Sequence, residues 1–461
     1  MRISDLRPPG KTKNSALVCP FPPLTAAEIA KTRYTLCEFM NRSFFRPVWR
    51  FLLLCCAAAF WMPLACAQSS APYSPPPDPA YFSYDARAPF LAVETPQPSP
   101  PGIRILRVSF PSPAPSPVSV NNTITGFLFL PSGPGPHPAM LVLHEWLPVN
   151  LNDEYTLCEG IARNRIAAFL MVEPYSLMRR PQPRVPFREI MSGNVPLMKE
   201  ALRQCVLDSR RCFDYLARRP DIDPARMGVS GISLGGVLAP LIAGVDKRAK
   251  VLLTFVGGAD VGGEVWENIM FKGFRPEFRR EGYTEDSVRV ALADFDAAHW
   301  LQGFNPKNAL QFNGRYDTFV TPSKAKILSR DLGGAAIIWS NTGHYGLHLS
   351  LARAEALGGK FLQSRFFADA PRFSPPNTVQ APTIKLGFLL GGHEGLSPAI
   401  ACQVFNFDRP GAVSLDAQLT THGLSAALSA RLGLTSAIGL ELPLLHRDRK
   451  IVPFFLLHFV P

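Results

Sequence analysis

Three residues of the chain have side chains that together could carry out acyl transfer: Ser233, Asp317 and His344. A serine hydroxyl is a weak nucleophile near neutral pH, so it needs a base within hydrogen-bond reach, and the base needs an acid to orient it. The residues follow one another in the order Ser, Asp, His, with 84 residues from 233 to 317 and 27 from 317 to 344. We expect each to lie at the end of a different strand, so that the three can converge.

The serine lies in the hexapeptide Gly231-Ile232-Ser233-Leu234-Gly235-Gly236, between an apolar run at 226–230 and a helical run at 237–245. This predicts a strand, a sharp turn and a helix, in which glycines remove Cβ atoms where the chain passes close to itself. The backbone N–H of Leu234 would then point to the space above the hydroxyl where negative charge develops. The competing interpretation is a glycine-rich turn with a solvent-exposed serine, because short motifs recur by chance.

The acid and the base each have a competitor. Asp317 follows an apolar strand predicted at 309–312, whereas Asp260 lies in a glycine-rich run that is less suited to hold a fixed carboxylate. His344 follows a strand predicted at 335–339, whereas His348 falls on the helix after that loop. We therefore predict Asp317 and His344 as the partners of Ser233.

A second backbone donor for the developing charge should come from the turn after the strand at 139–143. Trp146 is the predicted donor, paired with Leu234, and we expect His144 to have a structural role in the same turn. The sequence has no metal-ligand cluster, no phosphate-binding loop and no dinucleotide fingerprint. We therefore predict no metal and no cofactor.

The elements around these residues alternate between strands and helices from residue 103 to 370. A helix predicted at 199–217 has apolar residues at three- and four-residue spacing, hence one core face. Such alternation favours an α/β fold, a mostly parallel sheet with helices on both faces. An insertion at 264–300 is rich in aromatic residues. The slightly favoured interpretation is that they pack on the sheet. The alternative is that they form a cap over the active site and supply an acyl-binding wall.

Residues 103–365 resemble the α/β-hydrolase superfamily, and within it the dienelactone hydrolase and serine esterase branch. The motifs that carry the resemblance are Leu143-His144-Glu145-Trp146, the run from Arg219 to Arg226, the Gly231–Gly236 hexapeptide, Asp317 and His344. The resemblance implies Ser233 as nucleophile, His344 as base, Asp317 as its orienting acid, and backbone donors at Leu234 and Trp146. It does not cover residues 1–102 or the C-terminal region.

One departure from the family bears on the substrate. Dienelactone hydrolases proper use cysteine as the nucleophile, so the serine here favours an ordinary, small-molecule carboxylic ester. The sequence thus predicts an exported serine hydrolase that forms an acyl-enzyme. The alternative is a binding or surface protein whose hydrolase domain is inactive.

The N-terminal region explains the net charge of +12. Residues 1–67 carry nine Lys/Arg and three Asp/Glu, so half of the net positive charge lies there. The remainder of the chain has no long basic run. We therefore do not expect nucleic acid as a partner. Arginines at 42, 46 and 50 precede an apolar run at 51–62 and the small residues Ala65-Cys66-Ala67, which is the order of a secretory signal peptide. We expect a start at Met1 or Met40 and cleavage after Ala67, giving a periplasmic or secreted protein.

The two remaining regions flank the predicted hydrolase domain. Residues 68–102 are rich in proline and predict an extended linker, with order beginning near Ile103. Residues 377–461 show alternating apolar residues, such as Leu424, Ala426 and Leu428, which predict a small antiparallel β module of four to six strands. Outer-membrane barrel strands alternate in the same way, but about 85 residues reach only the minimum of eight strands, so membrane association is the less favoured alternative.

Four cysteines follow the predicted cleavage point, at 158, 205, 212 and 402. Cys205 and Cys212 are seven residues apart on a predicted helix, about 10 Å along its axis, which is too far for a disulfide. We expect buried thiols, and the alternative of one disulfide that includes Cys158 is left undecided by the sequence.

Overall fold

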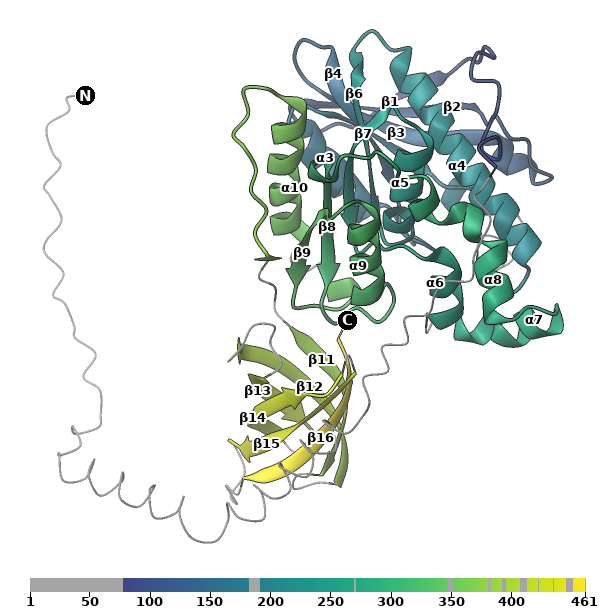
Figure 1. The fold of residues 1–461 in the computed structure, drawn as a ribbon. Helices are drawn as coiled ribbons and strands as arrows, with labels where there is room; N and C mark the ends of the chain where they lie inside the picture. Colours follow the sequence, from purple (N-terminus) through teal and green to yellow (C-terminus); the bar gives the residue numbers. More distant parts are fainter. Residues whose placement is uncertain are drawn as a thin grey trace, which may run out of the picture. The chain divides into compact units, whose positions relative to one another are not determined.

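The structure is a computed structural model, and it describes residues 78–181, 191–268, 271–346, 351–379, 381, 383–391, 395–406, 413–421, 423–433, 435–444 and 451–460. The predicted signal segment at 1–67 lies outside these residues. Within them the chain forms a large sheet covered by helices and a separate closed barrel (Figure 1). In the part of the chain described, no helix is both long enough and apolar enough to cross a membrane.

The large sheet has ten strands in the order β1-β2-β3-β5-β4-β6-β7-β8-β9-β10. The strands from β5 to β10 pair in parallel, and β1, β2 and β3 pair antiparallel with their neighbours. Their bounds are β1 Val93–Gln97, β2 Ile103–Pro111, β3 Thr123–Pro131, β4 His137–Leu143, β5 Ala167–Val172, β6 Ile222–Ile232, β7 Ala249–Phe255, β8 Ala309–Gly314, β9 Ala336–Ser340 and β10 Thr378–Val379.

The central strands are apolar on both faces because helices cover both. Every residue of β4, β5 and β8 is buried. One core cluster includes residues of helices α4, α5 and α9, and a second cluster includes residues of α3 and α10. The helices are α3 Asn152–Arg163, α4 Val195–Ala217, α5 Leu234–Val245, α9 Pro322–Asp331 and α10 Leu351–Phe366, with short 3-10 turns at η1 Ser119–Asn122 and η2 Leu177–Arg179. The predicted mostly parallel α/β sheet is confirmed.

The prediction of a linker over 68–102 is wrong for its described part, residues 78–102. Strand β1 pairs with β2 from Val93 to Gln97, and Phe82 is fully buried, with its ring 5.3 Å from that of Trp300. The aromatic residues among the prolines supply enough apolar surface to hold the segment on the domain. Proline is tolerated in β1 because this is an edge strand, where one face of the backbone needs no partner.

The insertion between β7 and β8 consists of short helices: α6 Val261–Glu267, η3 Lys272–Phe274, α7 Arg275–Arg280, α8 Glu285–Ala291, η4 Ala293–Phe295, η5 Ala297–His299 and η6 Pro306–Asn308. Some of its aromatic residues pack in the core and others reach a pocket. Phe278 and Phe295 are fully buried in the core, whereas Phe271 lines a pocket described below.

The C-terminal module is a closed antiparallel barrel of six strands, at the upper end of the predicted number. The strands are β11 Ile384–Gly391, β12 Gly395–Asn406, β13 Val413–Thr420, β14 Gly423–Arg431, β15 Ser436–Pro443 and β16 Val452–Phe459. The predicted boundary at residue 377 is too early, because Thr378–Val379 pairs with β9 of the large sheet. The dipeptide Pro375-Pro376 marked a break in composition, and the chain adds one more short strand after it.

Candidate active site

Ser233 lies at a sharp turn between β6, which ends at Ile232, and α5, which begins at Leu234. Its backbone has φ 55° and ψ −112°, a conformation that residues other than glycine rarely adopt. A Cβ added to Gly231 would lie 2.2 Å from the Gly235 carbonyl, and one added to Gly235 would lie 2.5 Å from the Leu143 carbonyl oxygen. The turn therefore requires glycine at both places, as the hexapeptide predicted.

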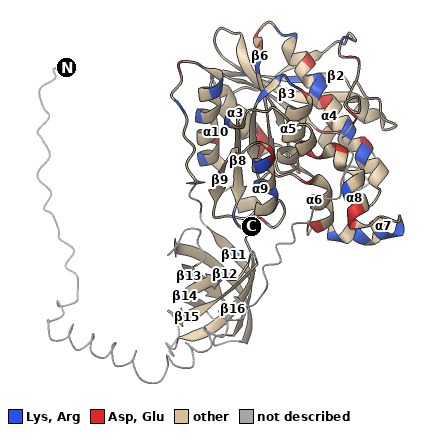
Figure 2. Ribbon diagram, in the orientation of Figure 1, with Lys and Arg blue, Asp and Glu red and all other residues tan. Residues whose placement is uncertain are grey.

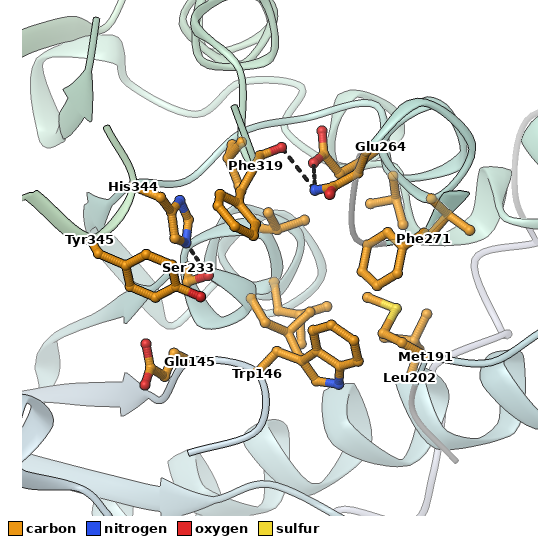
Figure 3. Close-up of a pocket in the computed structure, with 17 residues that line it drawn as sticks. Glu145, Trp146, Met191, Leu202, Ser233, Glu264, Phe271, Phe319, His344 and Tyr345 are labelled. Atoms are coloured by element: carbon orange, nitrogen blue, oxygen red, sulfur yellow. Dashed lines mark hydrogen bonds between the residues drawn. The ribbon is translucent and has the colours of Figure 1, made fainter. Parts of the chain in front are cut away.

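The side chains of Ser233, His344 and Asp317 form a chain of hydrogen bonds. The Ser233 Oγ lies 2.8 Å from His344 Nε2 (Figure 3). On the other side of the ring, His344 Nδ1 lies 2.8 Å from Asp317 Oδ2. The other carboxylate oxygen of Asp317 accepts hydrogen bonds from the backbone N–H groups of Phe319 and Val320. Asp317 is thus fixed on both oxygens, and with its Nδ1–H directed at Asp317 the imidazole presents Nε2 to the serine hydroxyl.

Three parallel strands bring these residues together. Ser233 follows β6, Asp317 follows β8 and His344 follows β9, so all three lie past the carboxyl ends of their strands. Those ends meet at one edge of the sheet. The structure therefore brings together the three residues that the sequence selected, although their separations in the chain are large.

The two predicted oxyanion donors, Leu234 and Trp146, line the same pocket as Ser233. Leu234 is the first residue of α5, so its N–H has no acceptor in the helix. Trp146 follows β4, and no acceptor for its N–H is found in the described chain. Both N–H groups are thus available to a ligand, and the adjacent N–H of Gly235 is not, because it donates to the His144 carbonyl.

His144 fixes the turn that carries Trp146. Its Nε2 accepts a hydrogen bond from the Glu173 backbone N–H at 3.0 Å, and Nδ1 lies 2.6 Å from the Glu145 carbonyl oxygen, to which it donates. Burial lowers the pKa of His144 to about 4, so this imidazole is neutral at pH 7. The expected structural role of His144 agrees with these contacts.

The competing acid, Asp260, is engaged elsewhere. It has ion pairs with Arg289 and Lys324, each at 2.6 Å, and its Oδ1 caps helix α6 through the Gly263 N–H. Burial alone would raise the pKa of Asp260, but the two cations hold it below its ordinary value. The competing base, His348, lies outside the described residues.

The pocket beside Ser233 is partly open to solvent and has walls that are mostly apolar. Trp146 and Phe271 contribute to one wall, with ring centroids 5.1 Å apart (Figure 3). The lining residues are Glu145, Trp146, Met191, Leu202, Ser233, Leu234, Val237, Leu238, Val261, Glu264, Val265, Asn268, Phe271, Phe319, Val320, His344 and Tyr345.

Two carboxylates and an amide of this pocket were not assigned a role from the sequence. Glu264 accepts a hydrogen bond from the Asn268 amide at 2.6 Å, and burial raises the pKa of Glu264 to about 7. Glu145 precedes Trp146 in the same turn. Neither residue type nor spacing distinguishes a carboxylate in a pocket from one in solvent, so no signal in a single sequence could have found them.

The His344 imidazole is more basic than an ordinary histidine. Burial by itself would lower the pKa of His344, but the charge and hydrogen bond of Asp317 raise it above the ordinary value of 6.5. The negative charges of Glu145 and Glu264 act in the same direction. The site therefore favours a positive charge on the imidazole, which is what a base needs after taking a proton.

Within the described residues no group of three or more His, Cys, Asp or Glu is arranged to hold a metal ion. The described cysteines at 158, 205 and 212 are buried free thiols, and Cys402 is an exposed free thiol. The disulfide that the sequence left open is not formed at Cys158.

Comparisons with known proteins give likenesses of limited extent. No protein-family model matches the chain. A stretch of 55 residues, 12% of this chain and only 18% of the relative, is 36% identical to the putative hydrolase YtaP of Bacillus subtilis (strain 168). Among solved structures, the acetyl xylan esterase of Paenibacillus sp. R4 is 20% identical with a TM-score of 0.45, over 60% of this chain and 91% of that one. A putative dienelactone hydrolase of Klebsiella pneumoniae subsp. pneumoniae MGH 78578 is 16% identical with a TM-score of 0.37, over 61% of this chain and 100% of that one.

The fold itself follows from the topology of this chain. Strands β2 to β9 lie in the order β2-β3-β5-β4-β6-β7-β8-β9, with the second strand antiparallel to its neighbours. The serine turn follows β6, and the acid and the histidine follow β8 and β9 in the order Ser, Asp, His. The chain therefore has the α/β-hydrolase fold.

Proposed function

We propose that the chain is a serine hydrolase that cleaves carboxylic esters through an acyl-enzyme. The observation that carries this proposal is the pair of 2.8 Å hydrogen bonds that link Ser233, His344 and Asp317 on three strand ends. A serine in strained backbone geometry, hydrogen-bonded to a buried imidazole that a fixed carboxylate orients, is the arrangement that activates a hydroxyl for attack.

In the first half-reaction the Ser233 Oγ attacks the ester carbonyl carbon as its proton passes to His344 Nε2. The carbonyl oxygen becomes an oxyanion, which the N–H groups of Leu234 and Trp146 stabilise. The C–O bond to the alcohol then breaks, and His344 gives its proton to the departing alkoxide. The products are the free alcohol and an ester between the acyl group and Ser233.

In the second half-reaction water takes the place of the alcohol. His344 removes a proton from water as the hydroxide attacks the acyl carbon, and the same two N–H groups stabilise the second oxyanion. The bond to Ser233 Oγ breaks, the serine regains its proton from His344, and the carboxylic acid leaves. The apolar pocket walls formed by Trp146 and Phe271 suit the acyl part of the substrate.

The experiment that tests this function compares Ser233→Ala with a nearby serine control. Ser230→Ala is the control, because Ser230 is buried three residues earlier in β6 and its Oγ has no hydrogen-bond partner in the described chain. With a short-chain aryl ester, Ser233→Ala should lose several orders of magnitude in kcat. Ser230→Ala should stay near the wild type, and only proteins with Ser233 should react with a fluorophosphonate probe.

Two results would overturn the proposal. Turnover by Ser233→Ala close to that of the wild type would place the chemistry elsewhere. A correctly folded wild type that resists the fluorophosphonate probe would instead favour an inactive hydrolase domain that only binds ligands or partners.

We also propose that the protein acts outside the cytoplasm, because residues 42–67 have the order of charges, apolar residues and small residues of a signal peptide. Expression of the full chain in a bacterium, followed by cell fractionation and N-terminal sequencing, should find a mature protein that begins at Gln68. Recovery of uncleaved protein in the cytoplasm would overturn this localisation.

A further inference from the structure

The C-terminal barrel has apolar side chains on its outer surface. All six strands contribute large apolar residues that are at least 37% exposed. These outer residues are Leu386, Phe388 and Leu390 on β11, Leu396, Ile400 and Val404 on β12, Leu415 and Leu419 on β13, Leu424 and Leu428 on β14, Leu440 on β15, and Phe455 and Leu457 on β16. The apolar surface is therefore a belt around the barrel and not a patch on one side.

Charged residues are placed in the opposite way. The described strand residues of the barrel include four charged ones, Lys385, Asp416, Arg431 and Glu441. Lys385, Asp416 and Glu441 are at most 4% exposed, and Arg431, at the end of β14, is partly buried. Figure 2 shows the barrel ribbon as largely tan, whereas helices α4, α7 and α8 carry many charged residues.

Inside the barrel several polar groups bind one another, whereas both ring nitrogens of buried His458 have no hydrogen-bond partner among the described residues. Lys385 Nζ lies 2.6 Å from Asp416 Oδ2, and the hydroxyls of Ser414 and Ser429 each donate to Asp416 at 2.8 Å. These partners stabilise charges that would otherwise be costly to bury. A small apolar cluster, which includes Phe454 and Leu456, fills another part of the interior.

This distribution is the reverse of that of a barrel surrounded by water. Folded proteins rarely leave large continuous apolar surfaces exposed, so something covers the belt. A protein partner or a second copy of the chain would cover one side, whereas lipid hydrocarbon would surround the whole barrel. We propose that the outer belt of the barrel is immersed in the hydrocarbon of a lipid bilayer and anchors the protein there.

Two further features fit a lipid environment. A closed barrel has no edge strand with unpaired backbone groups, which hydrocarbon could not satisfy. The strands are 8 to 12 residues long, close to the roughly 9 to 11 residues of a tilted strand that crosses a bilayer. With six strands the barrel is smaller than the outer-membrane barrels of eight strands or more, so the proposal concerns an anchor and not a channel of that kind.

The test is co-flotation of the full-length protein with vesicles of phosphatidylcholine alone, after dilution from a mild detergent. Wild-type protein should float with the vesicles. A barrel variant with Leu390→Lys, Ile400→Lys, Leu419→Lys and Leu457→Lys should lose at least tenfold of the floating fraction, because each lysine must leave water to enter hydrocarbon. Neutral vesicles are used so that the added positive charges do not attract the protein to the lipid.

A matched control adds the same four charges outside the barrel. Leu91, Val149, Met178 and Val290 are apolar residues of the hydrolase domain that are 41% to 92% exposed. Their replacement by lysine should leave flotation unchanged. Far-UV circular dichroism and fluorophosphonate labelling of Ser233 show whether both variants have kept their fold.

The exposed thiol of Cys402, on β12 of the barrel, gives an independent measurement. An environment-sensitive fluorophore attached to Cys402 should become brighter when the protein binds vesicles. Nitroxide-labelled acyl chains should then quench its fluorescence. The same labelling of the Cys402→Ser variant measures the background from the other cysteines. The proposal is overturned if the wild type does not float, or if the folded barrel variant floats as well as the wild type. It is also overturned if lipid-free protein is a discrete dimer that shields Cys402 and does not float, because a second copy would then cover the belt.

Discussion

At the scale of single residues, the site depends on how two aspartates that both follow sheet strands are held. The Asp317 carboxylate touches His344 and two backbone N–H groups, whereas that of Asp260 touches Arg289 and Lys324. Sequence alone favoured Asp317 on the compactness of its turn. The contacts give the physical reason, since only one of the two carboxylates is free of a competing cation.

Replacement of Asp317 by asparagine should therefore lower kcat by roughly 10⁴, the loss expected when the imidazole is left in the wrong tautomer. The Asp260→Asn variant should keep kcat within about tenfold, and its loss of two ion pairs should appear in the thermal midpoint instead. Steady-state kinetics and thermal melts of the two variants show which aspartate orients His344. A larger kinetic loss in Asp260→Asn would mean that the acid has been misassigned.

The raised pKa of His344 predicts the pH dependence. The base must be neutral to accept the serine proton, so kcat/KM should fall as the pH decreases through a value above the ordinary 6.5 of histidine. Because the negative charge of Glu145 contributes to the raised pKa, Glu145→Gln should move this acidic limb to lower pH. The Glu159→Gln variant, at a partly exposed position of α3 where the carboxylate pairs with Arg163, is the control and should leave the profile unchanged. An unshifted limb in Glu145→Gln would contradict the proposed electrostatic coupling.

At the scale of secondary-structure elements, the β6–α5 turn can form only if backbone segments approach one another closely. In Gly235→Ala the new methyl group would lie 2.5 Å from the Leu143 carbonyl oxygen, so we expect a loss of about 3 kcal/mol in the free energy of unfolding. Gly160→Ala, in the middle of α3, has nothing within 4 Å of its new methyl group and should gain up to about 1 kcal/mol. Urea unfolding measures both, and equal stabilities would show that the turn can relax.

The insertion between β7 and β8 supplies one wall of the pocket through Phe271. Replacement of Phe271 by alanine should open this wall and raise kcat/KM for a hexanoyl ester relative to an acetyl ester by about tenfold. Tyr283, in the same insertion, packs against the core and does not line the pocket, so Tyr283→Ala should leave the ratio unchanged. The same ratio in the wild type and Phe271→Ala would place the acyl group elsewhere.

At the scale of the whole molecule, the chain contains two bodies of opposite polarity. The hydrolase domain is built around a large apolar core, whereas the barrel has apolar side chains on its outer surface and the buried charges of Lys385, Asp416 and Glu441 inside. Because Lys385 and Asp416 are both buried, the stability of the barrel should depend on the presence of both charges or of neither. Lys385→Met leaves Asp416 buried without its cation and should cost about 3 kcal/mol or more.

The double variant Lys385→Met, Asp416→Leu should recover most of the stability lost in Lys385→Met, because no buried charge is left alone. Proteolysis of the C-terminal segment at increasing urea concentration measures the stability of the barrel. If the single variant were as stable as the wild type, the two side chains would not be a buried pair in the folded protein.

The amino-acid sequence determined the elements of the hydrolase domain and the three residues of the candidate site. Continuous apolar runs can be stable only as buried strands, which is why the predicted strands at 103–110, 123–130 and 167–172 agree with the structure within a residue. Ser233, Asp317 and His344 could be selected because their order and their positions after strands are local properties. The closeness of Gly231 to Gly235 was also encoded locally, in the spacing of the glycines.

Tertiary structure alone decided how distant segments pack. The prolines at 78–102 predicted a linker, but contacts between Phe82 and Trp300, more than 200 residues apart, hold the segment on the domain. The pocket carboxylate of Glu264 acquires its raised pKa only through burial by other elements. In the barrel, alternation identified two faces but could not say which one is inside. Closure of six strands fixed that choice, because it placed the Lys385–Asp416 pair in the interior and the leucines outside.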